Sequence, residues 1–324
     1  MTELTVCMNV YNGEKFLDRS IGSVRSQTLQ DFRILVYDDG STDGTVQKLR
    51  SFHDDRIRIV EGGENRGVLY SRAVMIPMID TEYCMWLDDD DCFCRDDALE
   101  RALSLAKAGD YDVVSFENMN IAHADGGMRT LRRASTDKAF IDGNFLRGLD
   151  GYYCQQLVSK IFKSELLKKC VPEKEVYDRR FVADEQFFLV PMALHLRRYF
   201  MSSEEPIYMY YNDIGVWGLK KDDRSLDRMR GLCEYTYSLV LSCYRRISEA
   251  RPMTALEKKT LVRMCGVEGL CFAMKNVAEE DRGKAFELWR EFFGKDGMHL
   301  LNGVDDFIMP VHLKYLEGVI VGEG

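Results

Sequence analysis

The N-terminal part of the chain alternates short apolar runs with segments that are apolar on one helical face. The apolar runs predict strands at residues 4–10, 32–37, 57–60 and 83–87. The segments between them predict helices, because apolar side chains recur there every three or four residues. These side chains are Phe16, Leu17, Ile21 and Val24, then Val46, Leu49 and Phe52, and then Leu69, Ala73, Val74 and Ile76. Strands that alternate with helices predict βαβ units and a mostly parallel sheet.

Acidic residues directly follow two of the predicted strands. Asp38 and Asp39 end the second strand, and four consecutive aspartates, Asp88 to Asp91, end the fourth. Ligands of parallel sheets bind beyond the carboxyl ends of the strands. Neighbouring carboxylates repel one another, and oxygen ligands are what Mg²⁺ prefers when it shares its shell with phosphates. The pattern therefore predicts a divalent-metal site, with a solvated acidic turn as the alternative.

The remaining chain continues as mixed structure and then becomes helical. We predict a helix at 97–108 that is capped by Asp96 and Asp97. In the same way, Ser41, Thr42 and Asp43 can cap the second helix. A strand at 113–116 and a hairpin turn at 125–127 follow. After about residue 220, apolar helical faces are formed by Leu232, Tyr235, Leu239, Tyr244, Leu270, Phe272, Phe286, Trp289 and Phe293. The prediction is an α/β domain at 1–215 and a helical C-terminal extension at 216–324.

Composition and charge narrow the class of protein. The chain has 324 residues, is 46% hydrophobic and 30% charged, and carries a net charge of -9, so it has no overall attraction for nucleic acid. No apolar run is long enough to cross a membrane, and the N-terminus lacks the pattern of a signal peptide. We therefore expect a cytoplasmic protein, for which peripheral contact with a membrane stays open. The ten cysteines are expected to be buried or incidental thiols.

No other catalytic motif competes with the acidic clusters. The first strand is not followed by G-x-G-x-x-G, and the sequence contains no P-loop, no G-x-S-x-G elbow and no H-E-x-x-H pair. The chemistry therefore has to be sought in the carboxylates at the ends of the strands.

Several ordered motifs over residues 4–215 together resemble the family 2 glycosyltransferases. The motifs are 6–17 (VCMNVYNGEKFL), 23–28 (SVRSQT), 36–45 (VYDDGSTDGT), 65–67 (NRG) and 86–91 (WLDDDD), with weaker matches at 160–167, 183–187 and 205–211. The resemblance implies a GT-A fold, which is a Rossmann-like α/β fold with a mostly parallel central sheet and flanking helices. It also implies a nucleotide-diphosphate sugar donor and Mn²⁺ or Mg²⁺.

The resemblance also implies roles for individual residues. The nucleotide would be bound by Tyr11, Asn12, Glu14, Asp38, Asp39, Asn65, Arg72, Asp88 and Asp89. Tyr11 would stack on the base, and Asp39, with Asp38 beside it, would accept a hydrogen bond from the base. Asp88 and Asp90 match the D-x-D positions: Asp88 would face the ribose, and Asp90 would hold the metal on the diphosphate.

The catalytic base would come from a later segment. Asp184 matches the usual acidic position of the family, and Glu185 is the alternative base; without the family match, Asp184 would equally suit a helix N-cap. The base would take the proton of an acceptor hydroxyl in a single displacement that inverts the sugar carbon. The acceptor would be a glycan or a lipid-linked sugar, and UDP is the expected nucleotide.

Three positions depart from the family pattern. Asn9 stands where many members have proline, Asp89 fills the variable middle position of the D-x-D motif, and Ala183 replaces the first acid of the usual Glu-Asp pair. Asp89 could therefore shift metal ligation by one residue, and Ala183 leaves room for a non-catalytic protein of the same fold. A nucleotidyltransferase on a similar sheet is a further alternative, although the glycine-rich triphosphate loop of such enzymes is missing after the first strand.

The sequence also bears on how many sugars are added and on the acceptor side. It lacks the Q-x-x-R-W motif and the membrane helices of the family's processive synthases, so we predict one sugar added per encounter. Aromatic residues that would suit sugar stacking, or else the protein core, are Tyr208, Tyr210, Tyr211 and Trp217.

Overall fold

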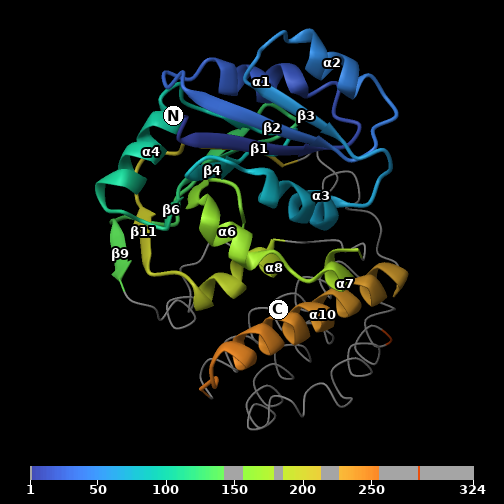
Figure 1. The fold of residues 1–324 in the computed structure, drawn as a ribbon. Helices are drawn as coiled ribbons and strands as arrows, with labels where there is room; N and C mark the ends of the chain where they lie inside the picture. The colour runs from blue at the N-terminus through green and yellow to red at the C-terminus, as the bar shows by residue number, and fades with distance from the viewer. Residues whose placement is uncertain (1, 142–155, 179–184, 213–225, 255–283, 285–324) are drawn as a thin grey trace. The chain divides into compact units, whose positions relative to one another are not determined.

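The computed structural model describes residues 2–141, 156–178, 185–212, 226–254 and 284. The chain forms two compact units, which are treated separately below (Figure 1). The first unit comprises Met1–Gly143, Cys154–Arg180 and His195–Leu219, and the second comprises Asn144–Tyr153, Phe181–Leu194 and Lys220–Gly324.

The first unit contains an eight-stranded sheet whose N-terminal half is parallel. Its strands are β1 (Leu4–Val10), β2 (Phe32–Asp38), β3 (Ile57–Glu61) and β4 (Tyr83–Trp86), in the spatial order β3-β2-β1-β4. All four strands were predicted, with ends that agree to within a residue. Because β1 pairs on both sides, its apolar side chains are almost all buried, and its carboxyl end lies between the acidic residues that follow β2 and β4.

Helices cross between these strands and cover both faces of the sheet. They are α1 (Leu17–Arg25), α2 (Thr45–Ser51), α3 (Val68–Met75) and the 3-10 turn η1 (Ile76–Met78). Figure 1 shows α1 and α2 on one face and α3 on the other. This placement follows from right-handed crossovers, because the chain reverses its direction across the sheet after β3.

The other half of the sheet mixes strand directions. Its strands are β10 (Lys160–Lys163), β6 (Val113–Phe116), β11 (Arg198–Ser202) and β9 (Lys138–Ile141), in that order beyond β4. Strand β10 is antiparallel to both neighbours, β11 is parallel to β6, and β9 is antiparallel to β11. Two short helices, α6 (Ser164–Cys170) and α7 (Lys174–Tyr177), follow β10.

A second, four-stranded sheet stands beside the acidic run. It consists of β5 (Cys92–Phe93), β12 (Tyr208–Tyr211), β7 (Met119–Ala122) and β8 (Met128–Leu131), in that order. The β7–β8 pair is the predicted hairpin. Because β5 begins immediately after the four aspartates and pairs with β12, a strand far away in the sequence lies against the acidic run.

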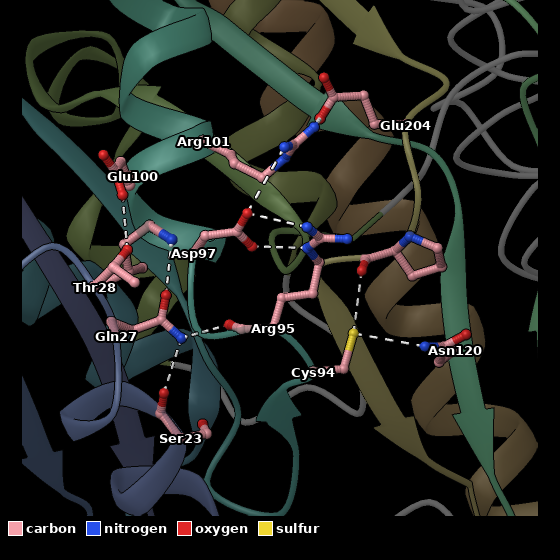
Figure 2. Close-up of polar contacts among 12 residues, drawn as sticks. Ser23, Gln27, Thr28, Cys94, Arg95, Asp97, Glu100, Arg101, Asn120 and Glu204 are labelled. Atoms are coloured by element: carbon pink, nitrogen blue, oxygen red, sulfur yellow. Dashed lines mark hydrogen bonds and ion pairs between the residues drawn. The ribbon is translucent and has the colours of Figure 1, made fainter.

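The segment at the end of α1 fastens that helix to the start of α4 (Ala98–Ala108) (Figure 2). The buried Gln27 side chain donates to the carbonyls of Ser23 and Arg95 at 3.0 and 2.7 Å, and its oxygen accepts the N–H of Leu99 at 3.0 Å. Gln27 therefore satisfies a free N–H in the first turn of α4. The expectation that Asp96 or Asp97 caps this helix was wrong.

The reason for that difference is a competing set of ion pairs. Asp97 precedes α4 but makes no capping hydrogen bond. Its carboxylate is bound by Arg95 at 2.8 and 3.0 Å, with Arg101 at 3.7 Å, and Arg101 also pairs with Glu204 (Figure 2). Helix α2 begins at Thr45, and Asp43, one of the three predicted capping residues, accepts the N–H of Thr45 at 3.0 Å.

The second unit is helical where the structure describes it. It contains α8 (Gln186–Leu189), the 3-10 turn η2 (Pro191–Leu194) and α10 (Leu226–Ala250). Leu239, Cys243 and Ile247 are buried at four-residue spacing on α10, as an amphipathic helix requires. The predicted faces at Leu270, Phe272, Phe286, Trp289 and Phe293 lie outside the described residues, and the boundary at residue 215 stays a prediction. Among the described helices, none is long and apolar enough to cross a membrane.

Candidate nucleotide-sugar site

The loops that follow β1 and β2 are tied together by side chains. Asn12 and Glu14 accept the N–H groups of Thr42 and Gly44 at 2.8 and 3.1 Å. In the other direction, the N–H groups of the first loop donate to Ser41, at 2.9 Å from Asn12, and to Thr45, at 2.9 Å from Gly13. The side chains of Asn12 and Glu14 thus hold the neighbouring loop, and they fix the backbone from which Tyr11 and Asp38 project.

Asp38 carries a buried oxygen that has no partner in the protein. Its side chain is 3% exposed, and Oδ2 accepts the N–H of Ser41 at 3.1 Å. The other oxygen, Oδ1, is buried and makes no hydrogen bond. Tyr11 follows Val10, the residue that pairs with Asp38 in the sheet, and its ring is 44% exposed. A buried acceptor and an exposed aromatic ring therefore lie at the adjoining ends of β1 and β2.

Both carboxylate oxygens of Asp39 are engaged in hydrogen bonds with the loop that leads into α3. Its two carboxylate oxygens accept the N–H groups of Arg66 and Gly67 at 2.9 and 2.8 Å, and the residue is 5% exposed. Gly67 has φ 93°, a value that favours glycine. The same loop contains Asn65, which is half-buried. Asp39 thus satisfies free N–H groups at the beginning of α3.

Arg72 connects α3 to the ends of β1 and β4. Its guanidinium donates to the side-chain oxygen of Asn9 at 3.2 Å and to Asp88 at 3.1 Å. The side chain is 4% exposed and lies over the ring of Trp86, at 5.4 Å from the centroid. Because the pair with Asp88 is largely shielded from water, it orients Asp88 firmly.

The four aspartates of the acidic run have different surroundings. Asp91 is fully buried and accepts the hydroxyl of Tyr208 at 2.7 Å and the N–H of Tyr211 at 2.8 Å. Asp91 also donates its own N–H to the carbonyl of Asp88, at 3.2 Å, which closes a turn. We call residues 88–91 the acidic turn.

The two middle aspartates face the loop after β1 and open space. A Cβ atom on Gly13 would lie 2.2 Å from Oδ2 of Asp89, so Asp89 fits only because residue 13 is glycine. Asp90 forms no ion pair with any side chain in the described part of the chain. Burial, reinforced by Asp90 and Asp88, raises the pKa of Asp89 well above its usual range. Burial and the charge of Asp88 raise the pKa of Asp90 to about 6.

These carboxylates suit a divalent cation that is shared with a ligand. Asp88 is one-third exposed, and Asp90 is held close to it in a crowded negative turn that a cation would relieve. Within the described residues there is no group of three or more His, Cys, Asp or Glu side chains that could hold a metal by themselves. One or two carboxylates plus a diphosphate form the usual shell of Mg²⁺, so Asp88 and Asp90 fit a metal that arrives with a nucleotide.

The predicted base belongs to the second unit. Asp184 lies outside the described residues, and Glu185 is the half-buried residue that immediately precedes α8. Sequence reasoning missed Arg19 of α1, which donates to the carbonyl of Asp90. It named Tyr208 but missed that the Tyr208 hydroxyl binds Asp91 of the acidic turn from β12. Tyr208 is fully buried, so it belongs to the core and does not stack on a sugar. Trp217 lies outside the described residues.

Comparisons with known proteins show the family and the fold of the chain. The model of glycosyl transferase family 2 matches residues 5–167. Poly(ribitol-phosphate) beta-N-acetylglucosaminyltransferase TarP from Staphylococcus aureus is 23% identical over 217 residues, which cover 66% of this chain and 64% of that protein. The matches to curated relatives cover 13% to 64% of the relatives' own lengths.

Two solved structures share the fold. The structure of S. aureus TarS in complex with UDP aligns over 99% of this chain and 88% of its own, with a TM-score of 0.68 and 17% identity. The mannosyltransferase PcManGT from Pyrobaculum calidifontis, in complex with GDP-Man and Mn²⁺, aligns over 98% of this chain and 85% of its own, with a TM-score of 0.55 and 13% identity.

The chain belongs to glycosyl transferase family 2, because the family model covers half of it. The predicted GT-A fold is confirmed: the sheet is mostly parallel in its N-terminal half, and its architecture is that of TarS.

Proposed function

We propose that this chain is a metal-dependent, inverting glycosyltransferase that moves a sugar from a UDP-sugar to an acceptor hydroxyl. The observation that carries the proposal is the buried, unpartnered Oδ1 of Asp38 at the end of β2, together with the exposed Tyr11 at the adjoining end of β1. A buried acceptor without a partner is costly, and a ligand that donates an N–H removes that cost. Uracil offers a ring N–H to the carboxylate and a flat face to the tyrosine.

This assignment differs in one residue from the sequence-based expectation. Asp39 was expected to accept the hydrogen bond from the base, but its oxygens already accept two backbone N–H groups. Asp38 has the free oxygen, so Asp38 receives the base in our proposal. Asn12 and Glu14 then contribute by holding together the loops after β1 and β2. Any contact of Asn12, Glu14 or Asn65 with the nucleotide stays a prediction.

The diphosphate lies, in this proposal, at the acidic turn. Asp90 and Asp88 hold Mn²⁺ or Mg²⁺, which would neutralise the charge that develops on the leaving diphosphate. Arg72 fixes Asp88, so that Asp88 keeps one orientation toward the ribose and the metal. Asp89 lies against Gly13 and is not assigned to the metal.

Asp184 is the proposed base, with Glu185 as the alternative. It takes the proton of the acceptor hydroxyl while the acceptor oxygen bonds to the anomeric carbon. The bond from that carbon to the diphosphate oxygen breaks in the same step, and the nucleoside diphosphate leaves with the electron pair. The acceptor is a glycan or lipid-linked sugar of a surface polysaccharide, and the group moved is a hexosyl or N-acetylhexosaminyl group. Two relatives support this class by their names, the poly(ribitol-phosphate) beta-N-acetylglucosaminyltransferase TarP and a teichoic acid poly(glycerol phosphate) polymerase from Staphylococcus epidermidis. We further propose a cytoplasmic location, with peripheral contact with the membrane where the acceptor is lipid-linked.

The first experiment measures thermal unfolding with UDP, GDP, CDP and dTDP, each with and without Mn²⁺. A ligand that binds the native state raises the melting temperature according to its occupancy. We expect the largest rise with UDP and Mn²⁺ and the smallest with CDP, because the ring N3 of cytosine accepts and cannot donate to Asp38. No rise with any nucleotide would refute the donor site.

The second experiment separates an enzyme from a non-catalytic binding protein. Asp184→Asn should keep the rise caused by UDP and Mn²⁺ but lose hydrolysis of a UDP-sugar and transfer to acceptors. Asp55→Asn is the matched control, because Asp55 is an exposed aspartate before β3, at the opposite end of the strands. Wild-type protein that binds UDP but neither hydrolyses nor transfers any UDP-sugar would favour the non-catalytic alternative.

A further inference from the structure

One buried hydroxyl touches both ends of the acidic turn. Tyr208 is fully buried in β12, and its hydroxyl donates to Oδ2 of Asp91 at 2.7 Å. The same hydroxyl oxygen accepts the N–H of Asp88 at 3.4 Å. A single group from a strand 117 residues away in the sequence thereby spans the turn from its first to its last residue.

Two further contacts fasten the turn from the same side. The N–H of Tyr211 donates to the other oxygen of Asp91 at 2.8 Å. Arg19 of α1 lies 3.7 Å from the centre of the Tyr211 ring and donates to the carbonyl of Asp90. The strand β4 itself ends at Trp86. The turn lies beyond the end of β4 and is held by contacts from β12 and α1, in addition to the pair between Arg72 and Asp88.

These contacts give the aspartates of the acidic turn different roles. Both oxygens of Asp91 are engaged with β12 and are fully buried, so Asp91 cannot reach a ligand without breaking two hydrogen bonds. Asp88 and Asp90 are partly accessible. Residues that hydrogen-bond to metal-ligating residues fix the orientation of the ligands. Mutation of such residues lowers metal affinity by about 10- to 100-fold.

We propose that Tyr208 is a positioning residue for the metal ligands, acting through Asp91 and the backbone of Asp88. The proposal rests on the proposed function, since it assigns a cation and a diphosphate to the acidic turn. Tyr208 touches neither, and it sets the separation and direction of the carboxylates that do.

The test measures Mn²⁺ affinity directly, from the free Mn²⁺ signal in electron paramagnetic resonance, at saturating UDP. Tyr208→Phe keeps the ring and removes only the hydroxyl, and we expect its Mn²⁺ dissociation constant to rise about tenfold. Binding of UDP without metal should change less than twofold, because Tyr11 and Asp38 lie outside the turn. Tyr83→Phe is the matched control, because Tyr83 is a buried tyrosine at the start of β4, away from the acidic turn.

A second variant makes the test independent of stability. Asp91→Asn should weaken Mn²⁺ binding to a similar degree, and the double variant should weaken it little more than either single change, since both alter one contact. If Tyr208→Phe does not yield folded protein, Asp91→Asn is judged by the same criterion.

Three outcomes would refute the proposal. The first is unchanged Mn²⁺ affinity in both folded variants, and the second is an equal loss in Tyr83→Phe at an equal fall in melting temperature. In these two cases the proposed function stands, because the wild-type protein binds Mn²⁺ and UDP. Wild-type protein that binds neither would overturn the proposed function, and this inference with it.

Discussion

The loops beyond β1 and β2 and the acidic turn beyond β4 are held in different ways. Asn12, Glu14 and Asp39 bind backbone N–H groups about thirty residues away, in the neighbouring βα unit. The acidic turn is bound by Arg72, Arg19 and the β12 tyrosines, which come from three different elements. The loops beyond β1 and β2 are thus held by neighbouring βα units of the fold. The acidic turn depends on contacts from elements throughout the first unit.

The two regions also differ in charge. In the loop beyond β2, Asp39 accepts two N–H groups and Asp38 accepts one. In the acidic turn, burial raises the pKa values of Asp89, Asp90 and Asp91, and the neighbouring carboxylates add to the effect. The carboxylate oxygens of Asp38 and Asp39 therefore all accept hydrogen bonds except for Oδ1 of Asp38. The acidic turn, in contrast, carries excess negative charge that a cation would neutralise.

Removing Asp90 should separate the two regions most clearly. In Asp90→Ala we expect the Mn²⁺-dependent part of the UDP effect on melting temperature to vanish, while the metal-independent part stays. Transfer should fall by two to three orders of magnitude, as is typical when a group that stabilises developing charge is lost (about 10²–10³-fold). Asp55→Asn should leave both unchanged. If Asp90→Ala kept the metal response, the metal would have to bind elsewhere.

The charge of the acidic turn predicts an unusual dependence of stability on pH. The pKa of Asp90 in the folded protein is raised to about 6 from an ordinary value of 3.8. Between these values the native state binds more protons than the unfolded state, so its stability falls as pH rises. Each unit of pKa shift corresponds to about 1.4 kcal/mol.

Asp90→Asn removes this titration. In EDTA we expect the variant to melt at a higher temperature than the wild type at pH 7.5, and the difference to close as pH falls below 5. Melting curves in EDTA from pH 4.5 to 8 measure this. Parallel curves for the two proteins over that range would show that Asp90 is not strained by its neighbours.

A methyl group at Gly13 should disturb both regions at their point of contact. The new Cβ would lie 2.2 Å from Oδ2 of Asp89 and 2.6 Å from Cγ2 of Val10. We expect Gly13→Ala to lower the free energy of unfolding by about 1–3 kcal/mol, the usual cost of overpacking, and to weaken the Mn²⁺ response.

Gly22→Ala is the control for that variant. Gly22 lies in α1 with no atom within 4 Å of the new Cβ, so alanine should stabilise the helix by about 0.5–1 kcal/mol. Denaturant unfolding of both variants measures the two effects. Wild-type stability and metal response in Gly13→Ala would mean that Asp89 does not lie against the first loop.

Substitutions of the adjacent residues Asp38 and Asp39 should have different effects on stability and on UDP binding. Asp39→Ala removes the acceptor of two N–H groups at the start of α3, and we expect a loss of about 1–2 kcal/mol of stability. Asp38→Asn can still accept the N–H of Ser41, so its stability should change less. Its amide would face the N–H of uracil, however, and UDP binding should be lost. Unfolding and UDP titration of both variants test this; UDP binding lost only in Asp39→Ala would reverse the assignment.

Sequence reasoning alone predicts the strands, the crossover helices and the carboxyl edge where the acidic groups gather. Alternating apolar runs fix β1 to β4 because side chains that share one core must recur with the period of the element. The two acidic clusters, Asp38–Asp39 and Asp88–Asp91, could be predicted to lie at one edge of the sheet because both directly follow buried strands. The choice of Asp39, Asp88 and Asp90 among them came only from the family resemblance. The order of the family motifs added the class of protein.

Which of these carboxylates are available to a ligand follows from the three-dimensional contacts of each side chain. In the sequence Asp38 and Asp39 are equivalent neighbours, and Asp88 to Asp91 are four identical letters. Their hydrogen-bond partners come from β12, from α1 and from the start of α3, and these partners leave Oδ1 of Asp38 and the side chain of Asp90 for a ligand. The physical reason is that a local pattern fixes where a side chain lies along its own element, whereas its availability depends on which donors the fold brings within 3 Å.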